Sequence, residues 1–265
     1  MAIALASPLS IMRPSPNQVW RVWLRHAIAW KRFYRTSILL NFFEPITGLV
    51  GLGFGLGSYV HLIDGVRFIQ FIGPGLVAVT AMNATSFDSL FATYNFLHEN
   101  RVYPSMITSP VSVDDLTVGT LLWQATRAMI YGGTFLAIIT AFQLVHSWWA
   151  ILAIPVLALT GIMFAAPAMA FAATARIFEQ MFYYITLLIT PMFTFSGIFF
   201  PPSRLPHGVQ VAIWFTPLYH VANLIRSLVL GRVHANLFVD VLWMLVFTAL
   251  MLLLPANRIR KKLMV

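Results

Sequence analysis

Residues 68–97, FIQFIGPGLVAVTAMNATSFDSLFATYNFL, contain a single charged side chain, Asp88. A membrane-crossing helix needs about 20 mainly apolar residues, so this segment is long enough to cross a bilayer core with some tilt or to project beyond it. The whole chain of 265 residues is 59% hydrophobic and only 9% charged, whereas soluble domains have about 25% charged residues. Such a chain cannot cover its surface with polar groups, so we expect an all-α integral membrane protein.

Six segments are long and apolar enough to be transmembrane helices: 37–60, 68–97, 116–145, 150–174, 181–200 and 237–255. An even number of spans places both termini on one side of the membrane. Of the 17 Lys and Arg residues, twelve fall in the two terminal segments and in the loops that join them on that side, counting Arg101 and Arg176. Four lie on the opposite face: Arg67, Arg204, Arg226 and Arg232. Because basic residues concentrate in cytosolic segments, both termini are expected in the cytosol.

The chain before the first span divides into two parts. Residues 1–16 lack a basic region ahead of their short, proline-broken apolar run, so we interpret them as a flexible cytosolic tail rather than a secretory signal. Residues 17–35 form an amphipathic helix on which five residues recur at helical spacing: Val19, Trp23, His26, Ala27 and Trp30. This helix either anchors the chain in the headgroup region or also contacts a cytosolic partner.

Residues 36–265 are expected to form the transmembrane domain, which includes an unusual outer region at 201–236. That region has four prolines, Pro201, Pro202, Pro206 and Pro217, each of which removes a backbone donor. Irregular backbone at membrane depth requires protein or water around it. We therefore expect re-entrant or interfacial helices here, with FFPPSRLP as the turn and YHVANLIRSLVLG as the returning helix.

Three charged residues lie deep within the expected spans: Glu44, Asp88 and Arg127. Each lies roughly 12–17 Å from the cytosolic end of its helix at about 1.5 Å per residue. Opposite charges at a shared depth indicate neutralisation between neighbouring helices, and the alternative is that they line a path for a polar substrate. Asp240, at the start of the last span, is within reach of Arg226 or Arg232.

The longest cytosolic loop, residues 98–115, reads HENRVYPSMITSPVSVDD. Its short apolar segment projects into the cytosol with nothing of its own to pack against, so a partner is expected there. Asp114 and Asp115 follow Ser112 and favour the N-terminus of the next helix. Arg176 and Glu179, in the second cytosolic connection, could contact the same partner.

Composition and spacing also exclude several kinds of site. There are no cysteines, the seven histidines show no metal-ligand spacing, and no phosphate-binding G-x-x-x-x-G-K-[ST] motif is present. We expect no metal, no catalytic site and no nucleic-acid binding, since the net charge of +9 clusters at the chain ends. The stretch GLVGLGFGLGSYV at 48–60 lacks the G-x-G-x-x-G spacing of a nucleotide site. It instead has two small-xxx-small pairs that favour helix packing: Gly51 with Gly55, and Gly53 with Gly57.

Five segments in order resemble the type-2 ABC exporter permeases, and in particular their NodJ-like branch, from about residue 20 to the end. They are NFFEP (41–45), GPGLVAVTAMNATSFDSLF (73–91), RVYPSMITSPVSVDD (101–115), SGIFFPPSRLP (196–206) and TPLYHVANLIRSLVLG (216–231). The resemblance implies a multi-pass permease of a bacterial inner membrane that forms a homodimer. It also implies two copies of a separate NodI-like ATPase, which would bind ATP and Mg, so this chain would be a transport subunit and not an enzyme.

The resemblance assigns roles by position. Residues 17–35 would be the interface helix. Residues 99–108 would be the coupling helix, which would contact the ATPase. The coupling residues of this chain would include Glu99, Asn100, Arg101, Val102, Tyr103, Pro104, Ser105 and Met106. The outer re-entrant helices at 201–230 would include Pro201, Pro202, Arg204, His207, Tyr219, His220 and Arg226. ATP-driven closure would rotate the first two spans against the fifth span of the other protomer. Four aromatic residues of the first span could then face sugar rings or acyl chains, or else face lipid: Phe42, Phe43, Phe54 and Tyr59.

The resemblance leaves the exported molecule open. Members of this branch export lipo-chitooligosaccharides, and wider relatives export polysaccharides, teichoic acids and drugs, so a permease for drugs or amphipathic small molecules is an alternative. A second alternative is a membrane assembly subunit without transport activity. A membrane-embedded enzyme acting on lipid-linked sugar would need a constellation of acids or histidines at the membrane surface, which the sequence does not show.

Overall fold

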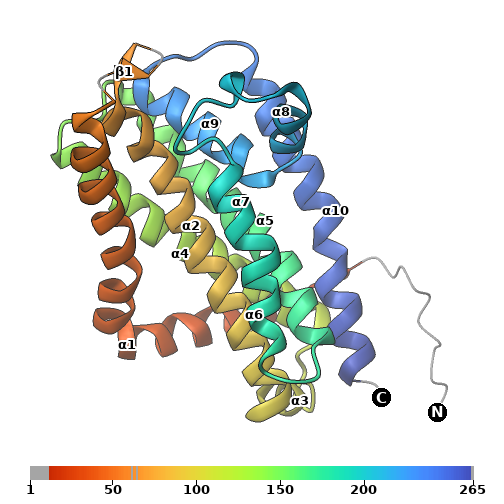
Figure 1. Ribbon diagram of the computed structural model, residues 1–265. Coiled ribbons are helices and arrows are strands. Elements are labelled where there is room, and N and C mark those ends of the chain that lie inside the picture. Colours follow the sequence, from red (N-terminus) through yellow and green to blue (C-terminus); the bar gives the residue numbers. More distant parts are fainter. Residues whose placement is uncertain (1–11, 61, 64, 264–265) are drawn as a thin grey trace.

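The computed structural model describes residues 12–60, 62–63 and 65–263, which form a mainly helical bundle with one small sheet (Figure 1). The α-helices are α1 (Pro16–Val50), α2 (Phe68–Tyr94), α3 (Val102–Met106), α4 (Val113–Ala141), α5 (Ala153–Thr174), α6 (Gln180–Tyr184), α7 (Thr190–Phe195), α8 (His207–Trp214), α9 (Pro217–Leu230) and α10 (Leu237–Leu263). Strands β1 (Leu62–Ile63) and β2 (Val66–Arg67) pair antiparallel, with Leu62 opposite Arg67. Short π-helical segments extend α1, α2 and α6: Gly51–Gly55, Asn95–Glu99 and Ile185–Ile189. Three 3-10 turns complete the secondary structure: Leu56–Ser58, Trp148–Leu152 and Pro202–Arg204.

Helix α1 bends sharply part-way along its length. The axes of its two parts, Pro16–Ser37 and Asn41–Ser58, meet at 56°. The proline ring of Pro45 clashes with the carbonyl four residues earlier, which accounts for a kink near Asn41. The first part therefore lies across the end of the bundle where α3 is found, and the second runs along the bundle towards β1 (Figure 1). These two ends are called the α3 end and the hairpin end below.

Within the described part of the chain, three helical segments are long and apolar enough to cross a membrane: Phe68–Glu99, Trp148–Thr174 and Leu237–Leu263. The bent pair within α1 would make a fourth. The other two predicted spans coincide with α4, which carries Gln124 and Arg127 along its length, and with the α6–α7 segment. The latter runs from Gln180 to Phe195 and is shorter than the roughly 20 residues of a full crossing. The expected helical membrane architecture is thus confirmed, with three or four candidate crossings by length and composition.

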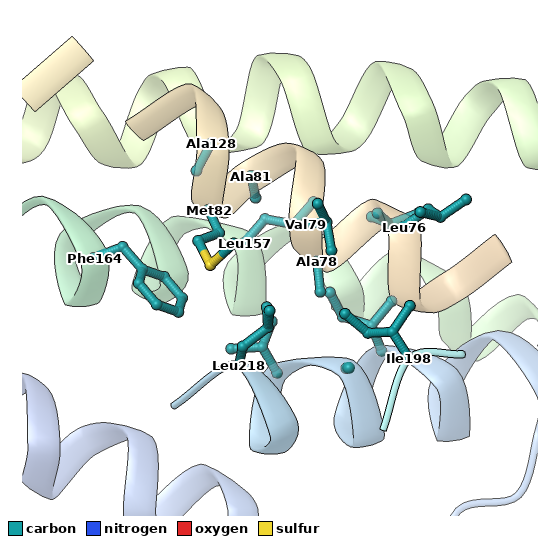
Figure 2. Close-up of a cluster of buried hydrophobic side chains, with 14 of the residues drawn as sticks. Leu76, Ala78, Val79, Ala81, Met82, Ala128, Leu157, Phe164, Ile198 and Leu218 are labelled. Carbon is teal, nitrogen blue, oxygen red and sulfur yellow. The ribbon is translucent and has the colours of Figure 1, made fainter. Parts of the chain in front are cut away.

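Helix α2 lies at the centre of the bundle. It contacts α1, α4, α5 and α9, and 89% of the most apolar 18-residue segment of Phe68–Glu99 is buried. Figure 2 shows Met82 of α2 with Leu157 and Phe164 of α5 around it, while Leu218 of α9 lies on the same side. Because α2 is packed on most sides, a face of α2 that lines a cavity is an exception to its packing.

The outer region predicted at 201–236 contains two helices separated by a break. The FFPPSRLP segment contains the 3-10 turn Pro202–Arg204, and helix α8 follows it. Pro217 begins α9 at its first turn, where a proline costs no hydrogen bond, and Gly231 ends it with a left-handed φ of 72°. Helix α9 packs on α2 and α10 at the hairpin end, at the position predicted for the returning helix.

Candidate functional site

A cavity of about 990 Å³ lies beside α2 and is lined also by residues of α1, by Arg127 of α4 and by Phe193 and Phe199. Its α2 wall is a single face, because Thr80, Asn83, Phe87, Phe91 and Asn95 recur three or four residues apart. Along this face the aromatic rings of Phe87 and Phe91 are therefore flanked by the carboxamides of Asn83 and Asn95. This face was not predicted, although two asparagines in so apolar a segment were a signal that could have indicated it.

The cavity also contains an ion pair between α2 and α4. Arg127 Nη1 lies 3.1 Å from Asp88 Oδ1, and Gln124 Nε2 donates to Asp88 Oδ2 at 2.7 Å. Arg127 Nη2 donates to the carbonyl of Ala84 at 3.3 Å, and its guanidinium lies over the ring of Tyr131. The side chains are only 10% exposed for Arg127 and 26% for Asp88. A pair this enclosed holds the two helices together and also places its carboxylate at the cavity wall.

The remaining residues predicted for a path lie elsewhere. Phe42 is buried with its ring 6.0 Å from that of Tyr131, while Phe43, Phe54 and Tyr59 are exposed. None of these four aromatics is among the residues that line the cavity. The side chain of Glu44 lies outside the part of the chain that the structure describes.

The four glycines predicted to pack helices fall into two pairs. A Cβ on Gly53 would lie 2.8 Å from Ile69 of α2, and one on Gly57 would lie 3.7 Å from Phe68. By contrast, a Cβ on Gly51 or Gly55 would meet nothing within 4 Å. One pair thus packs within the protomer, and the other faces open space.

At the α3 end, the predicted coupling segment forms a short helix whose two sides differ. Tyr103 is 1% exposed and its ring lies 5.7 Å from Phe96, while Glu99, Arg101 and Ser105 are exposed. Asn100 is also exposed, and Val102, Pro104 and Met106 are half-buried. The Tyr103 hydroxyl faces Thr93 and Thr120, and burial raises the pKa of Tyr103 above the ordinary value. Tyr103 therefore fastens α3 to the bundle and leaves the polar residues to face outward.

The second connection, residues 175–180, lies against the end of α2. The ring of Phe178 is 5.8 Å from Tyr94 and 5.5 Å from Phe91. Arg176 and Glu179 are both exposed beside it. The two loops predicted to contact a partner are thus both attached to the helix that lines the cavity.

The amphipathic part of α1 packs its tryptophan face on α4. Trp23 Nε1 donates to Thr126 Oγ1 at 3.0 Å, and Trp30 Nε1 donates to the hydroxyl of Tyr131 at 2.9 Å. His26 Nε2 lies 3.2 Å from Thr120 Oγ1. The face that was predicted to suit the headgroup region is therefore used largely for contact within the protein.

At the hairpin end, the predicted outer residues surround a second cavity of about 640 Å³. Its lining includes Pro201, Pro202, His207, Tyr219 and Arg226, and the adjacent Arg204 lies in the 3-10 turn. Arg226 Nε donates to the carbonyl of Phe71 at 3.0 Å, and its Nη2 donates to the carbonyl of Gly197 at 3.1 Å. Arg226 of α9 thus forms hydrogen bonds with both α2 and the segment after α7.

His220 is completely buried next to this cavity. Its Nδ1 lies 2.6 Å from Asp240 Oδ1, and its Nε2 lies 2.7 Å from the carbonyl of Trp214. Asn223 donates to the other oxygen of Asp240 at 2.7 Å. Asp240 was predicted to pair with an arginine, and the structure joins it to His220 and Asn223 instead. Among the described residues, no group of His, Asp and Glu side chains is arranged to hold a metal ion.

Comparison with known proteins assigns this arrangement to a family. Residues 17–230 match the ABC-2 type transporter family. The chain belongs to that family. Nodulation protein J of Rhizobium meliloti (strain 1021) is 38% identical over 224 residues, which are 83% of this chain and 85% of that protein. Nodulation protein J of Rhizobium leguminosarum bv. viciae is 35% identical over 244 residues, which are 92% and 94% of the two chains.

A more distant relative is the inner membrane transport permease YadH of Escherichia coli (strain K12), 21% identical over 213 residues, which are 79% of this chain and 82% of that protein. The resemblance stated from the sequence motifs is thereby confirmed for both the ABC-2 type transporter family and its NodJ-like branch. In this ABC-2 chain, the cavity beside α2 and the α3 end are the candidate functional sites.

Proposed function

We propose that this chain is the membrane-spanning permease subunit of an ATP-driven ABC exporter, and that the cavity beside α2 belongs to its translocation path. The observation that carries the proposal is the polar and aromatic α2 face that lines the larger cavity. Buried polar groups facing a cavity in a membrane protein mark a route for polar cargo. The family membership supplies the transport class.

The cargo that fits this wall best is an amphipathic saccharide. Carboxamides of Asn83 and Asn95 can both donate to and accept from sugar hydroxyls. The rings of Phe87 and Phe91 offer apolar faces to sugar rings or acyl chains. We therefore propose a lipo-chitooligosaccharide or a similar lipid-linked saccharide as cargo, with an amphipathic drug as the alternative.

The remaining features of the proposal concern assembly and orientation. The exposed polar side of α3, with Arg176 and Glu179 nearby, would contact an ATP-binding subunit resembling NodI, present in two copies. The chain would form a homodimer in a bacterial inner membrane. It would cross six times, with residues 1–16 as a cytosolic tail, 17–35 as the interface helix, 201–236 as the outer region and both termini in the cytosol. ATP and Mg would be bound by the ATPase and not by this chain.

Co-purification tests the transport class first. An affinity-tagged chain should bring down an ATPase carrying Walker motifs from native membranes. Absence of any ATPase under conditions that preserve the membrane complex would favour a non-transport assembly subunit instead.

Stimulation of ATPase activity tests the cargo. The reconstituted complex in nanodiscs should respond to lipo-chitooligosaccharide more than to a long polysaccharide or an amphipathic drug. Asn83→Ala and Asn95→Ala should each weaken that response, whereas Asn236→Ala, at an exposed position outside the cavity, should not. Equal responses in all three variants would remove the α2 face from the proposed path.

A further inference from the structure

A third, smaller groove of about 400 Å³ lies between α5, α10 and the helix that begins with α6. It is separate from the two cavities described above, since the three share no lining residue. Two large apolar side chains of its wall are exposed: Leu187 is 76% exposed and Leu188 is 46% exposed. The protomer itself leaves these residues uncovered.

The polarity of the groove changes in the same direction on all three helices. Along α5 the lining runs from Pro167 to Thr174, and along α10 it runs from Leu254 to Arg258, one helical turn later. On the third helix, Tyr183 lies nearer the α3 end than Leu187 does. The groove is therefore apolar within the bundle and becomes polar towards the α3 end.

Two polar groups at the polar end lack protein partners. Arg258 is exposed and makes no ion pair or hydrogen bond with the residues that the structure describes. The hydroxyl of Tyr184, which also lines the groove, is buried without a hydrogen-bond partner among those residues. No lining residue is acidic. An unmatched guanidinium at the polar end of an apolar groove that has no acidic lining residue favours an anionic, amphipathic ligand.

We infer that this groove binds an anionic glycerophospholipid, with an acyl chain against Leu187 and Leu188 and the phosphate at Arg258. Basic pockets between membrane helices on the cytosolic side bind anionic headgroups, and a guanidinium matches two phosphate oxygens at once. The assignment to the cytosolic leaflet rests on the proposed orientation of the permease, but lipid binding itself requires neither cargo nor ATPase.

Native mass spectrometry of the full chain provides the test. The protein is released from vesicles of phosphatidylethanolamine and phosphatidylglycerol, and the fraction that retains phosphatidylglycerol is measured. Arg258→Gln should lower that fraction at least five-fold, and Arg258→Lys should lower it less. Lys262→Gln removes one positive charge from the same helix outside the groove, so it should retain the lipid. Equal retention in Arg258→Gln and Lys262→Gln would overturn the site, as would equal retention of phosphatidylcholine from neutral vesicles.

Cross-linking separates the lipid from a second copy of this chain as the occupant. The chain has no cysteines, so Leu187→Cys introduces a single thiol into the groove. We expect this thiol to form no cross-linked dimer under oxidation. A disulfide-linked dimer through this position would show that another protomer covers the groove and would overturn the inference. Neither readout depends on ATP hydrolysis, so failure of the lipid site and failure of the proposed export function are distinguishable.

Discussion

The ion pair between Asp88 and Arg127 supports the sharpest prediction, because both helices and the cavity depend on it. Asp88→Asn would leave the Arg127 guanidinium, only 10% exposed, without a carboxylate partner, and only neutral oxygens such as the carbonyl of Ala84 would remain to accept its hydrogen bonds. Removing one partner of a buried pair typically costs about 3–5 kcal/mol. Asp88 is 26% exposed, so partial solvation places the expected loss near the lower limit, at about 3 kcal/mol. That loss corresponds to a more than 100-fold change in the unfolding equilibrium constant, since about 1.4 kcal/mol is tenfold.

The double variant Asp88→Asn/Arg127→Gln tests whether the cost comes from an unmatched charge. With both charges absent, the total loss should be only about 1 kcal/mol, because replacing a whole buried pair is often nearly neutral. Unfolding in mixed micelles can be followed by the fluorescence of the eight tryptophans. Losses that simply add, with the double variant as unstable as the sum of the single variants, would refute this reasoning.

The same variants separate two roles of the pair in transport. If Asp88 and Arg127 only hold α2 against α4, the double variant should regain cargo-stimulated ATPase activity along with stability. If the carboxylate also contacts cargo, stability should return without the stimulation. Comparison of the two measurements on one protein preparation therefore decides between a structural clamp and a path residue.

Three further changes test other parts of the structure. Gly53→Leu should cost about 1–3 kcal/mol by forcing a side chain into the neighbouring helix, measured by the same unfolding assay, whereas Gly55→Leu should stay within about 0.5 kcal/mol. Tyr103→Glu should abolish coupled ATPase activity and reduce stability, because it buries a charge beneath α3. Ser105→Glu, on the exposed side, should weaken co-purification of the ATPase and leave the unfolding midpoint unchanged. His220→Ala should cost about 1–3 kcal/mol because it removes one of the two side-chain hydrogen bonds to the buried carboxylate of Asp240 and leaves only that of Asn223, and unchanged stability would contradict the importance of these hydrogen bonds.

The burial of individual residues shows which parts of the predicted coupling segment can contact a partner. The sequence identified residues 99–108 as a short projecting helix but gave no basis for dividing its residues between the bundle and a partner. The structure buries Tyr103 completely and leaves Arg101 and Ser105 exposed. A variant of Tyr103 therefore tests the attachment of α3, and only variants on the exposed side test contact with another subunit.

The sequence alone determined the class of protein, because hydropathy and proline act locally. Long apolar segments and scarce charge required a helical membrane protein, and Pro201, Pro202 and Pro217 marked the interrupted outer region. The motif order was also sufficient for the family. These features depend on the residues themselves and on their neighbours in the chain, so no knowledge of packing was needed.

Only the tertiary structure decided which faces of the helices line the cavity. Helices in an apolar environment are apolar on several sides, so hydrophobic periodicity does not distinguish a face towards lipid from a face towards protein. The sequence consequently left open whether the aromatics around Phe43 and Phe54 face a path or lipid, whereas the cavity wall comes from Asn83, Phe87 and Asn95 on α2. The hydrogen-bond partners of buried polar groups also depend on helix packing. Asp240 lies beside His220 because α9 packs against α10. Helix packing brings these residues together, and that packing depends on contacts between segments far apart in the chain.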